Sequence, residues 1–237
     1  MQNNWKLKIS QKLAKVFVRF IFLTPIFVCV ISCTSTINLT ALKDNKNTDS
    51  LRNELFKHEV SKLNLVDGDT LVDIGSQTGF HAFQLFHFYP NKFFILEDVT
   101  RKYFKNLKNP YIEFKAQKKY FKHNSIKIKG TSEKIPLNSD AYKTILCRMS
   151  LHEFKKPAKM LNEIKRILTK DGILIVEELI PRIKDEIDIG CKMKHLTKDE
   201  IVNLLSLQGL KLISSDTTNW EIRNANEANM NILMFKK

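Results

Sequence analysis

Residues 70–79, which read TLVDIGSQTG, constrain the fold more than any other part of the chain. The segment starts with apolar residues suited to a buried parallel strand, and an acid and two glycines follow before the next helical pattern. Gly75 and Gly79 permit a tight turn whose backbone can approach a ligand closely. The pattern predicts a nucleotide-binding strand, turn and helix.

A second apolar run, at residues 93–96, ends in Glu97 and Asp98. An acid at the tip of the second strand, about 20 residues beyond the turn, can accept hydrogen bonds from both hydroxyls of a ribose. Dinucleotide dehydrogenases use a similar turn, but Asp73 precedes the glycines here and would repel a pyrophosphate. The sequence therefore disfavours a dinucleotide as the ligand.

These residues resemble the first motif of the class I S-adenosylmethionine-dependent methyltransferases, which is acid-x-Gly-x-Gly-x-Gly. Asp73, Gly75 and Gly79 match this motif, and Gln77 replaces its middle glycine. The resemblance continues in the family's order through residues 130–137, 142–154 and 170–178, and it spans residues 51–237. It implies an α/β, doubly wound Rossmann-like fold with a mostly parallel seven-stranded sheet and an antiparallel last strand.

The resemblance also implies S-adenosylmethionine as the cofactor. The residues expected to bind it lie at or after the ends of the first three strands: Asp73, Gly75, Gly79, Glu97, Asp98, Thr131 and Ser132. The first three would hold the methionine end. Asp98 would bind the ribose, with Glu97 as the second choice, and the last two would lie beside the adenine. Many relatives carry an acid in place of Thr131, so adenine recognition here departs from the family.

The candidates for catalysis are His152 and Glu153, in the loop after the fourth predicted strand. A histidine can act as a base near neutral pH, although a structural histidine or a surface pair is the alternative. The Asn/Asp-Pro-Pro-aromatic tetrad of the amino-methylating nucleic-acid enzymes is absent there. We therefore expect methyl transfer to a small-molecule or membrane-associated acceptor. The rival prediction is a non-catalytic, lipid-anchored binding or scaffold protein that keeps the fold.

The first 33 residues have the pattern of a secretory signal. They contain five cations and no acid, and the apolar run 20–31 is shorter than the roughly 20 residues that cross a bilayer as a helix. Residues 30–33, VISC, resemble a bacterial lipoprotein signal, so Cys33 is predicted to be lipidated. An uncleaved anchor or a wrongly assigned start codon is the alternative. Residues 34–50 are predicted to be a flexible tether, and 51–237 the methyltransferase-like domain.

This leader predicts a membrane-anchored lipoprotein of a bacterial cell envelope that faces the periplasm, or a cytoplasmic protein if the leader is not a true signal. The membrane would be a partner through lipidated Cys33. S-adenosylmethionine is made in the cytoplasm and, being charged, does not cross membranes unaided. A periplasmic methyltransferase would therefore need imported cofactor, or the domain would have another task.

The chain is strongly basic, with a formal charge of +14; subtracting the five leader cations leaves +9. Residues 101–129 hold much of the excess, interleaved with aromatic residues. Such a segment is typical of a solvated helix face with inward aromatics, or of a surface that binds anionic lipid headgroups. Nucleic acid is an unlikely partner outside the cell.

Two cysteines lie in the domain, Cys147 and Cys191. A disulfide between them and two free thiols are both compatible with the sequence. Cys191 and His195 form a weak metal-ligand pair, and no second pair at ligand spacing completes a site, so no metal site is predicted.

Periodicity and turn residues predict the remaining elements. Helices are expected over residues 51–65, 80–89, 158–168 and 201–207, and further strands over 126–128, 145–147, 173–178, 210–214 and 231–235. Thr197 and Glu200 have the spacing of a capping box for the last helix. The irregular segment 180–196 follows the fifth strand and is expected to be a lid or a substrate wall.

Overall fold

A computed structural model describes residues 56–100, 120–188, 190–223 and 226–237 of the chain. The leader, Cys33, the tether and most of the basic aromatic segment fall outside these residues. Within the described ranges, no helix is long and apolar enough to cross a membrane.

The described residues form a seven-stranded sheet in the order β3-β2-β1-β4-β5-β7-β6. Strands β1 to β5 pair in parallel, whereas β7 is antiparallel to both of its neighbours. This arrangement confirms the predicted fold class. The strand bounds are β1 Thr70–Ile74, β2 Phe93–Asp98, β3 Ser125–Lys129, β4 Tyr142–Arg148, β5 Leu168–Leu179, β6 Lys211–Arg223 and β7 Asn226–Lys236.

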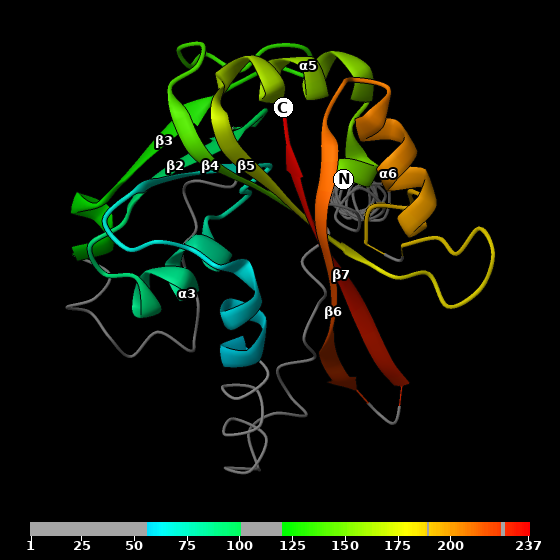
Figure 1. The fold of residues 1–237 in the computed structure, drawn as a ribbon. Helices are drawn as coiled ribbons and strands as arrows, with labels where there is room; N and C mark the ends of the chain where they lie inside the picture. The colour runs from blue at the N-terminus through cyan, green and yellow to red at the C-terminus, as the bar shows by residue number, and fades with distance from the viewer. Residues whose placement is uncertain (1–55, 101–119, 189, 224–225) are drawn as a thin grey trace, which may run out of the picture.

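Helices cover both faces of the sheet (Figure 1). One face packs against the helix at residues 56–63 and against α3, and the other packs against α5 and α6. Neighbouring residues of β1 point to opposite faces of the sheet: Leu71 packs on the side of α3, and Val72 packs on the side of α5 and α6. The helix bounds are α3 Phe80–Phe88, the 3-10 turn η3 Leu151–Glu153, α5 Pro157–Ile167 and α6 Lys198–Ser206.

Strands β5, β6 and β7 differ from the prediction. The last two form a hairpin that runs well beyond residues 210–214 and 231–235 and projects from the body of the sheet in Figure 1. Hairpin pairing is made by the backbone, so the polar sequence between these runs gave no apolar signal for it. Strand β5 begins at Leu168 rather than after the turn expected at 170–172. Tyr142 of β4 pairs with Leu168, whereas Thr144 pairs with Ile173, so the register shifts between these pairs. The residues of the expected turn lie in the stretch of β5 between them.

Candidate active site

The turn after β1 depends on its two glycines. Gly75 and Gly79 have φ angles of 71° and 76°, in the left-handed region that other residues rarely adopt. A Cβ at Gly75 would lie 2.5 Å from Cβ of Ser150, and one at Gly79 would lie 2.6 Å from Cδ1 of Leu96. Gln77, in place of the family's middle glycine, also takes a left-handed φ of 48°. The turn therefore keeps the backbone shape expected of the motif despite the substitution.

Three predicted acids gather beside this turn because β1 and β2 are adjacent parallel strands. Asp73, Glu97 and Asp98 are all buried, with 3%, 1% and 5% of their surfaces exposed. Oδ2 of Asp98 accepts a hydrogen bond from the backbone N–H of Gln77 at 2.9 Å, and Oδ1 accepts one from Thr100 at 2.8 Å. Asp98 thus helps to hold the glycine turn in place.

Burial makes these carboxyl groups reluctant to ionise. It raises the pKa of Asp73 to about 7 against the opposing charge of Arg148, and Asp98 adds to the rise. It also raises the pKa of Glu97 to about 7, and the charge of Asp98 acts in the same direction. The pKa of Asp98 is raised by burial as well, although backbone N–H groups oppose this. A bound cation would favour the ionised forms.

Buried oxygen atoms without hydrogen-bond partners at this turn show whether its residues suit S-adenosylmethionine as a ligand. Oγ of Ser76 and Oε1 of Glu97 are buried and have no hydrogen-bond partner within the described residues. Ribose hydroxyls donate hydrogen bonds, and the sulfonium and ammonium groups are positive, so acceptors and carboxylates suit both parts of the cofactor. The residues present fit the group.

Gly130 joins the segment after β3 to this cluster. A Cβ there would lie 1.9 Å from Oε1 of Glu97, so only a glycine permits this approach. Oγ1 of Thr131 accepts hydrogen bonds from the backbone N–H groups of Glu133 and Lys134 at 3.2 and 3.0 Å. Thr131 therefore stabilises a local turn next to the acids, and Ser132 lies partly exposed in that turn.

His152 and Glu153 lie in η3, directly after β4. The side chain of His152 has no exposed surface, and its Nδ1 lies 2.7 Å from Oε2 of Glu178 at the end of β5. The other oxygen, Oε1, accepts from the backbone N–H of Leu151 at 2.8 Å. Burial lowers the pKa of His152, but the hydrogen bond and charge of Glu178 outweigh it, so the pKa is raised. The structure thus adds Glu178 to the predicted pair.

A second buried charge network lies at the ends of β4 and β5, and the sequence did not predict it. Nε of Arg148 lies 2.9 Å from Oε2 of Glu177, and its NH2 group lies 3.4 Å from Oε1 of Glu59. His81 of α3 faces both carboxylates, at 3.6 Å from Glu177 and 3.9 Å from Glu59. The only local sign of this network in the sequence is the pair of adjacent acids near the end of β5, Glu177 and Glu178. The sequence does not show which distant residues pair with them.

The two domain cysteines are free thiols in the structure. Cys147 is buried in β4, and its Sγ lies 3.3 Å from Oγ of Ser150. Burial raises the pKa of this thiol, so it is not a ready nucleophile. Cys191 lies partly buried in the loop after β5. Of the two alternatives left open by the sequence, the structure has the free thiols.

A family model described as a methyltransferase domain matches residues 65–227. The chain belongs to this methyltransferase family. The match includes all of the predicted cofactor-binding and catalytic residues. No curated protein has a significant match to this methyltransferase.

Solved structures resemble the methyltransferase in fold. An S-adenosylmethionine-dependent methyltransferase from Aquifex aeolicus is 17% identical, with a TM-score of 0.56 over 75% of this chain and 88% of that chain. A possible histamine N-methyltransferase from Thermotoga maritima is 17% identical, with a TM-score of 0.55 over 78% and 90% of the two chains.

A third structure is that of the [4+2]-cyclase SpnF, which is 16% identical, with a TM-score of 0.61 over 80% of this chain and 81% of that chain. Its description shows that the fold alone does not fix the reaction. The family model and the methyltransferase neighbours together indicate S-adenosylmethionine as the cofactor.

Proposed function

We propose that this methyltransferase binds S-adenosylmethionine at the turn after β1 and transfers its methyl group to a small-molecule or membrane-associated acceptor. The observation that carries the proposal is the convergence of Asp73, Glu97 and Asp98, all buried, on a left-handed glycine turn. Burial raises the pKa of all three carboxyl groups, to about 7 for Asp73 and Glu97, and a positively charged ligand bound there would favour their ionised forms.

Each residue of the turn then has a role in this proposal. Asp73, with the backbone at Gly75 and Gly79, holds the methionine end and its ammonium group. Asp98 binds the ribose hydroxyls, and the unpartnered oxygen of Glu97 lies ready as a further acceptor. Thr131 and Ser132 follow Gly130, and the adenine lies beside them. When bound, the cofactor supplies an electrophilic methyl group.

The acceptor side is assigned to the loop after β4. Methyl transfer from a sulfonium mainly requires that the nucleophile be held in line with the methyl group and away from water. His152 and Glu153 lie on the segment that begins at Ser150, which packs against Gly75 of the cofactor turn. These two residues therefore belong to a segment that adjoins the cofactor turn, where an acceptor would meet the methyl group.

The acceptor class follows from the leader of the sequence rather than from the described residues. Lipidation of Cys33 would hold the domain at a bilayer surface, since acyl chains contribute about 0.8 kcal/mol per buried methylene. Anchoring favours acceptors that reach the membrane surface. A fractionation experiment tests this part: Cys33→Ser should move the protein from the membrane to the soluble fraction, and unchanged fractionation would contradict it.

Transfer itself is tested with S-adenosylmethionine carrying a labelled methyl group. The purified full-length protein is incubated with a total lipid extract and, separately, with a pool of small metabolites. The label should enter a component of either the lipid extract or the metabolite pool. Asp73→Asn should abolish this transfer, whereas Asp171→Asn, a change at an exposed acid, should leave it intact.

If no methyl transfer is seen, a measurement of cofactor binding distinguishes two explanations. A folded protein that binds the cofactor without transfer would place the acceptor outside both extracts and overturn the proposed acceptor class. A folded protein that binds no cofactor would support the non-catalytic binding or scaffold alternative.

A further inference from the structure

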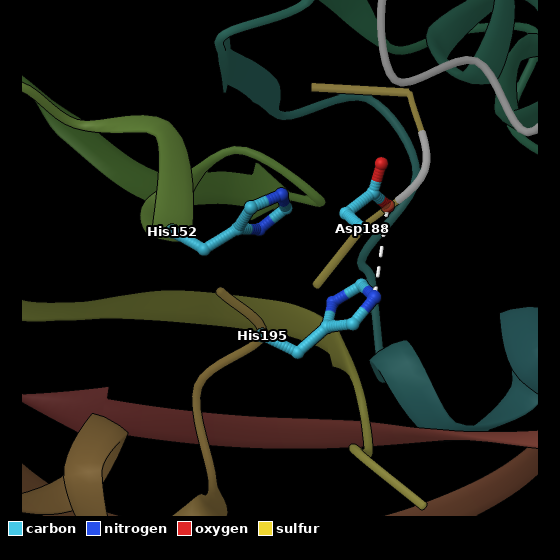
Figure 2. Close-up of side chains that lie close together, drawn as sticks. All are labelled: His152, Asp188 and His195. Carbon is cyan, nitrogen blue, oxygen red and sulfur yellow. Dashed lines mark ion pairs between the residues drawn. The ribbon is translucent and has the colours of Figure 1, made fainter. Parts of the chain in front are cut away.

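Three ligand-type side chains from separate segments meet beyond the ends of β4 and β5. His152 comes from η3, and Asp188 and His195 come from the loop after β5. One ligand atom from each lies within 4.8 Å of the other two, and Figure 2 shows the three side chains gathered around one place. The sequence offered only the pair of His195 with Cys191, because His152 is more than forty residues away in the chain.

His195 provides the observation that points to a ligand. Its side chain is only 9% exposed, and its Nδ1 atom is buried without a hydrogen-bond partner in the described ranges. Its Nε2 atom lies 3.7 Å from Oδ2 of Asp188, which is too long for a hydrogen bond. A buried imidazole with such weak contacts costs stability unless another group binds it.

Glu178 prepares His152 for the same role. The 2.7 Å contact between Nδ1 of His152 and the Glu178 carboxylate fixes the orientation of the imidazole ring. A carboxylate that orients a histidine in this way is the usual outer partner of a metal-bound imidazole.

The loop that carries the other two ligands is held in a hairpin-like shape. The backbone N–H of Asp188 donates to Met193 at 2.8 Å, and that of His195 donates to Glu186 at 2.9 Å. Oδ1 of Asp188 accepts from the backbone N–H of Cys191 at 3.0 Å, so its Oδ2 is the oxygen turned to His195. The positions of both ligands are thus fixed by the backbone of this loop.

From this geometry we propose that His152, Asp188 and His195 form a binding site for a divalent transition-metal ion of the zinc class. Two imidazoles and one carboxylate form a donor set that suits zinc better than magnesium, which prefers oxygen ligands. Tetrahedral ligands of one zinc ion lie about 3.3 Å apart, so small side-chain movements from separations of up to 4.8 Å would close the site. Three protein ligands leave a fourth position open.

The surroundings also favour this site over the other candidate in the described residues. Glu153 and Cys191 form a second group with the same His152, and Oε1 of Glu153 is buried without a partner, so further donors lie close by. The group of Glu59, His81 and Glu177 instead already holds a cation, because the Arg148 guanidinium lies against both of its carboxylates.

The metal site is independent of the proposed methyl transfer, because the ion would bind without cofactor or acceptor. It changes one detail of that proposal. A metal on Nε2 of His152 uses the lone pair that a general base would need, so His152 would then position an ion at the acceptor side rather than accept a proton.

The test is zinc binding to the full-length protein, purified in a mild detergent and freed of metal with a chelator. Zinc is titrated in competition with a chromophoric chelator, which gives stoichiometry and affinity without any activity assay. We expect one tight zinc ion per chain. His195→Gln and Asp188→Asn should each weaken its binding at least tenfold, and His123→Gln, at an exposed histidine of the described chain, should not change it.

Circular dichroism of each variant shows whether it has folded, and cobalt provides a second measurement on those that have. Cobalt bound by the unchanged protein should give the visible absorption of a four- or five-coordinate ion, and His195→Gln should lose it. Zinc affinity that is equal in the unchanged protein and in a folded His195→Gln variant would overturn the proposal, as would a six-coordinate cobalt spectrum.

Discussion

Cofactor affinity should depend steeply on pH, because two of the acids at the turn are partly protonated near neutrality. Burial raises the pKa of both Asp73 and Glu97 to about 7 in the free protein. A cationic ligand binds the ionised forms, so below this pKa binding must also remove the protons. For one such group the affinity falls about eightfold from about pH 7.5 to about pH 6, and for both about 70-fold, or ~2.5 kcal/mol.

Calorimetric titration with S-adenosylmethionine at these two pH values measures the effect. Repeating it in buffers with different heats of ionisation gives the number of protons released on binding. Glu97→Gln removes one titrating group, so the remaining pH dependence should fall to that of Asp73 alone. Affinities that agree within twofold at the two pH values, with no proton release, would refute the reasoning.

The same groups link pH to the stability of the free protein. Their folded pKa values lie above the unfolded values of about 4, so the fold favours the protonated forms. Their contribution to stability is present below about pH 4 and is lost as the pH rises through about 7. The increase in Tm that the cofactor produces should therefore be larger at pH 7.5 than at pH 6.

Three further substitutions test the site. Asp98→Ala should weaken cofactor binding by about 1–3 kcal/mol in a calorimetric titration, as for a lost hydrogen bond to a charged group, and an unaltered affinity would exclude the ribose role. Gly79→Ala should lower the free energy of unfolding by at least about 1–2 kcal/mol, since it forces a left-handed alanine against Leu96; equal urea midpoints would count against this. Arg148→Leu should cost about 3–5 kcal/mol by leaving Glu177 buried without its partner, and adding Glu177→Gln should restore part of it.

Local patterns predicted which acids and glycines lie together at the turn after β1. The run of apolar residues into Asp73 and the glycines identifies β1 and its turn, and the second apolar run places Glu97 and Asp98 beside them, because consecutive parallel strands end at one edge of the sheet. The capping box of Thr197 and Glu200 was also predicted, and both of its hydrogen bonds are present at the start of α6.

The acceptor half depends on contacts between distant segments, which local patterns do not contain. Glu178 reads as the last residue of a strand, and only the sheet order brings it to His152. The same holds for Arg148 and Glu59, which are 89 positions apart. The meeting of His195 with His152 depends in turn on how the loop after β5 folds back, and loops with mixed charges carry no periodic signal.

The most direct test of the account is a crystal structure of the protein in complex with S-adenosylhomocysteine. The account predicts that the ribose hydroxyls lie within hydrogen-bond distance of Asp98, that the amino group lies next to Asp73, and that the adenine lies beside Thr131 and Ser132. A ligand bound elsewhere, or crystals that take up none at saturating concentration, would contradict the claim that this glycine turn is the cofactor site.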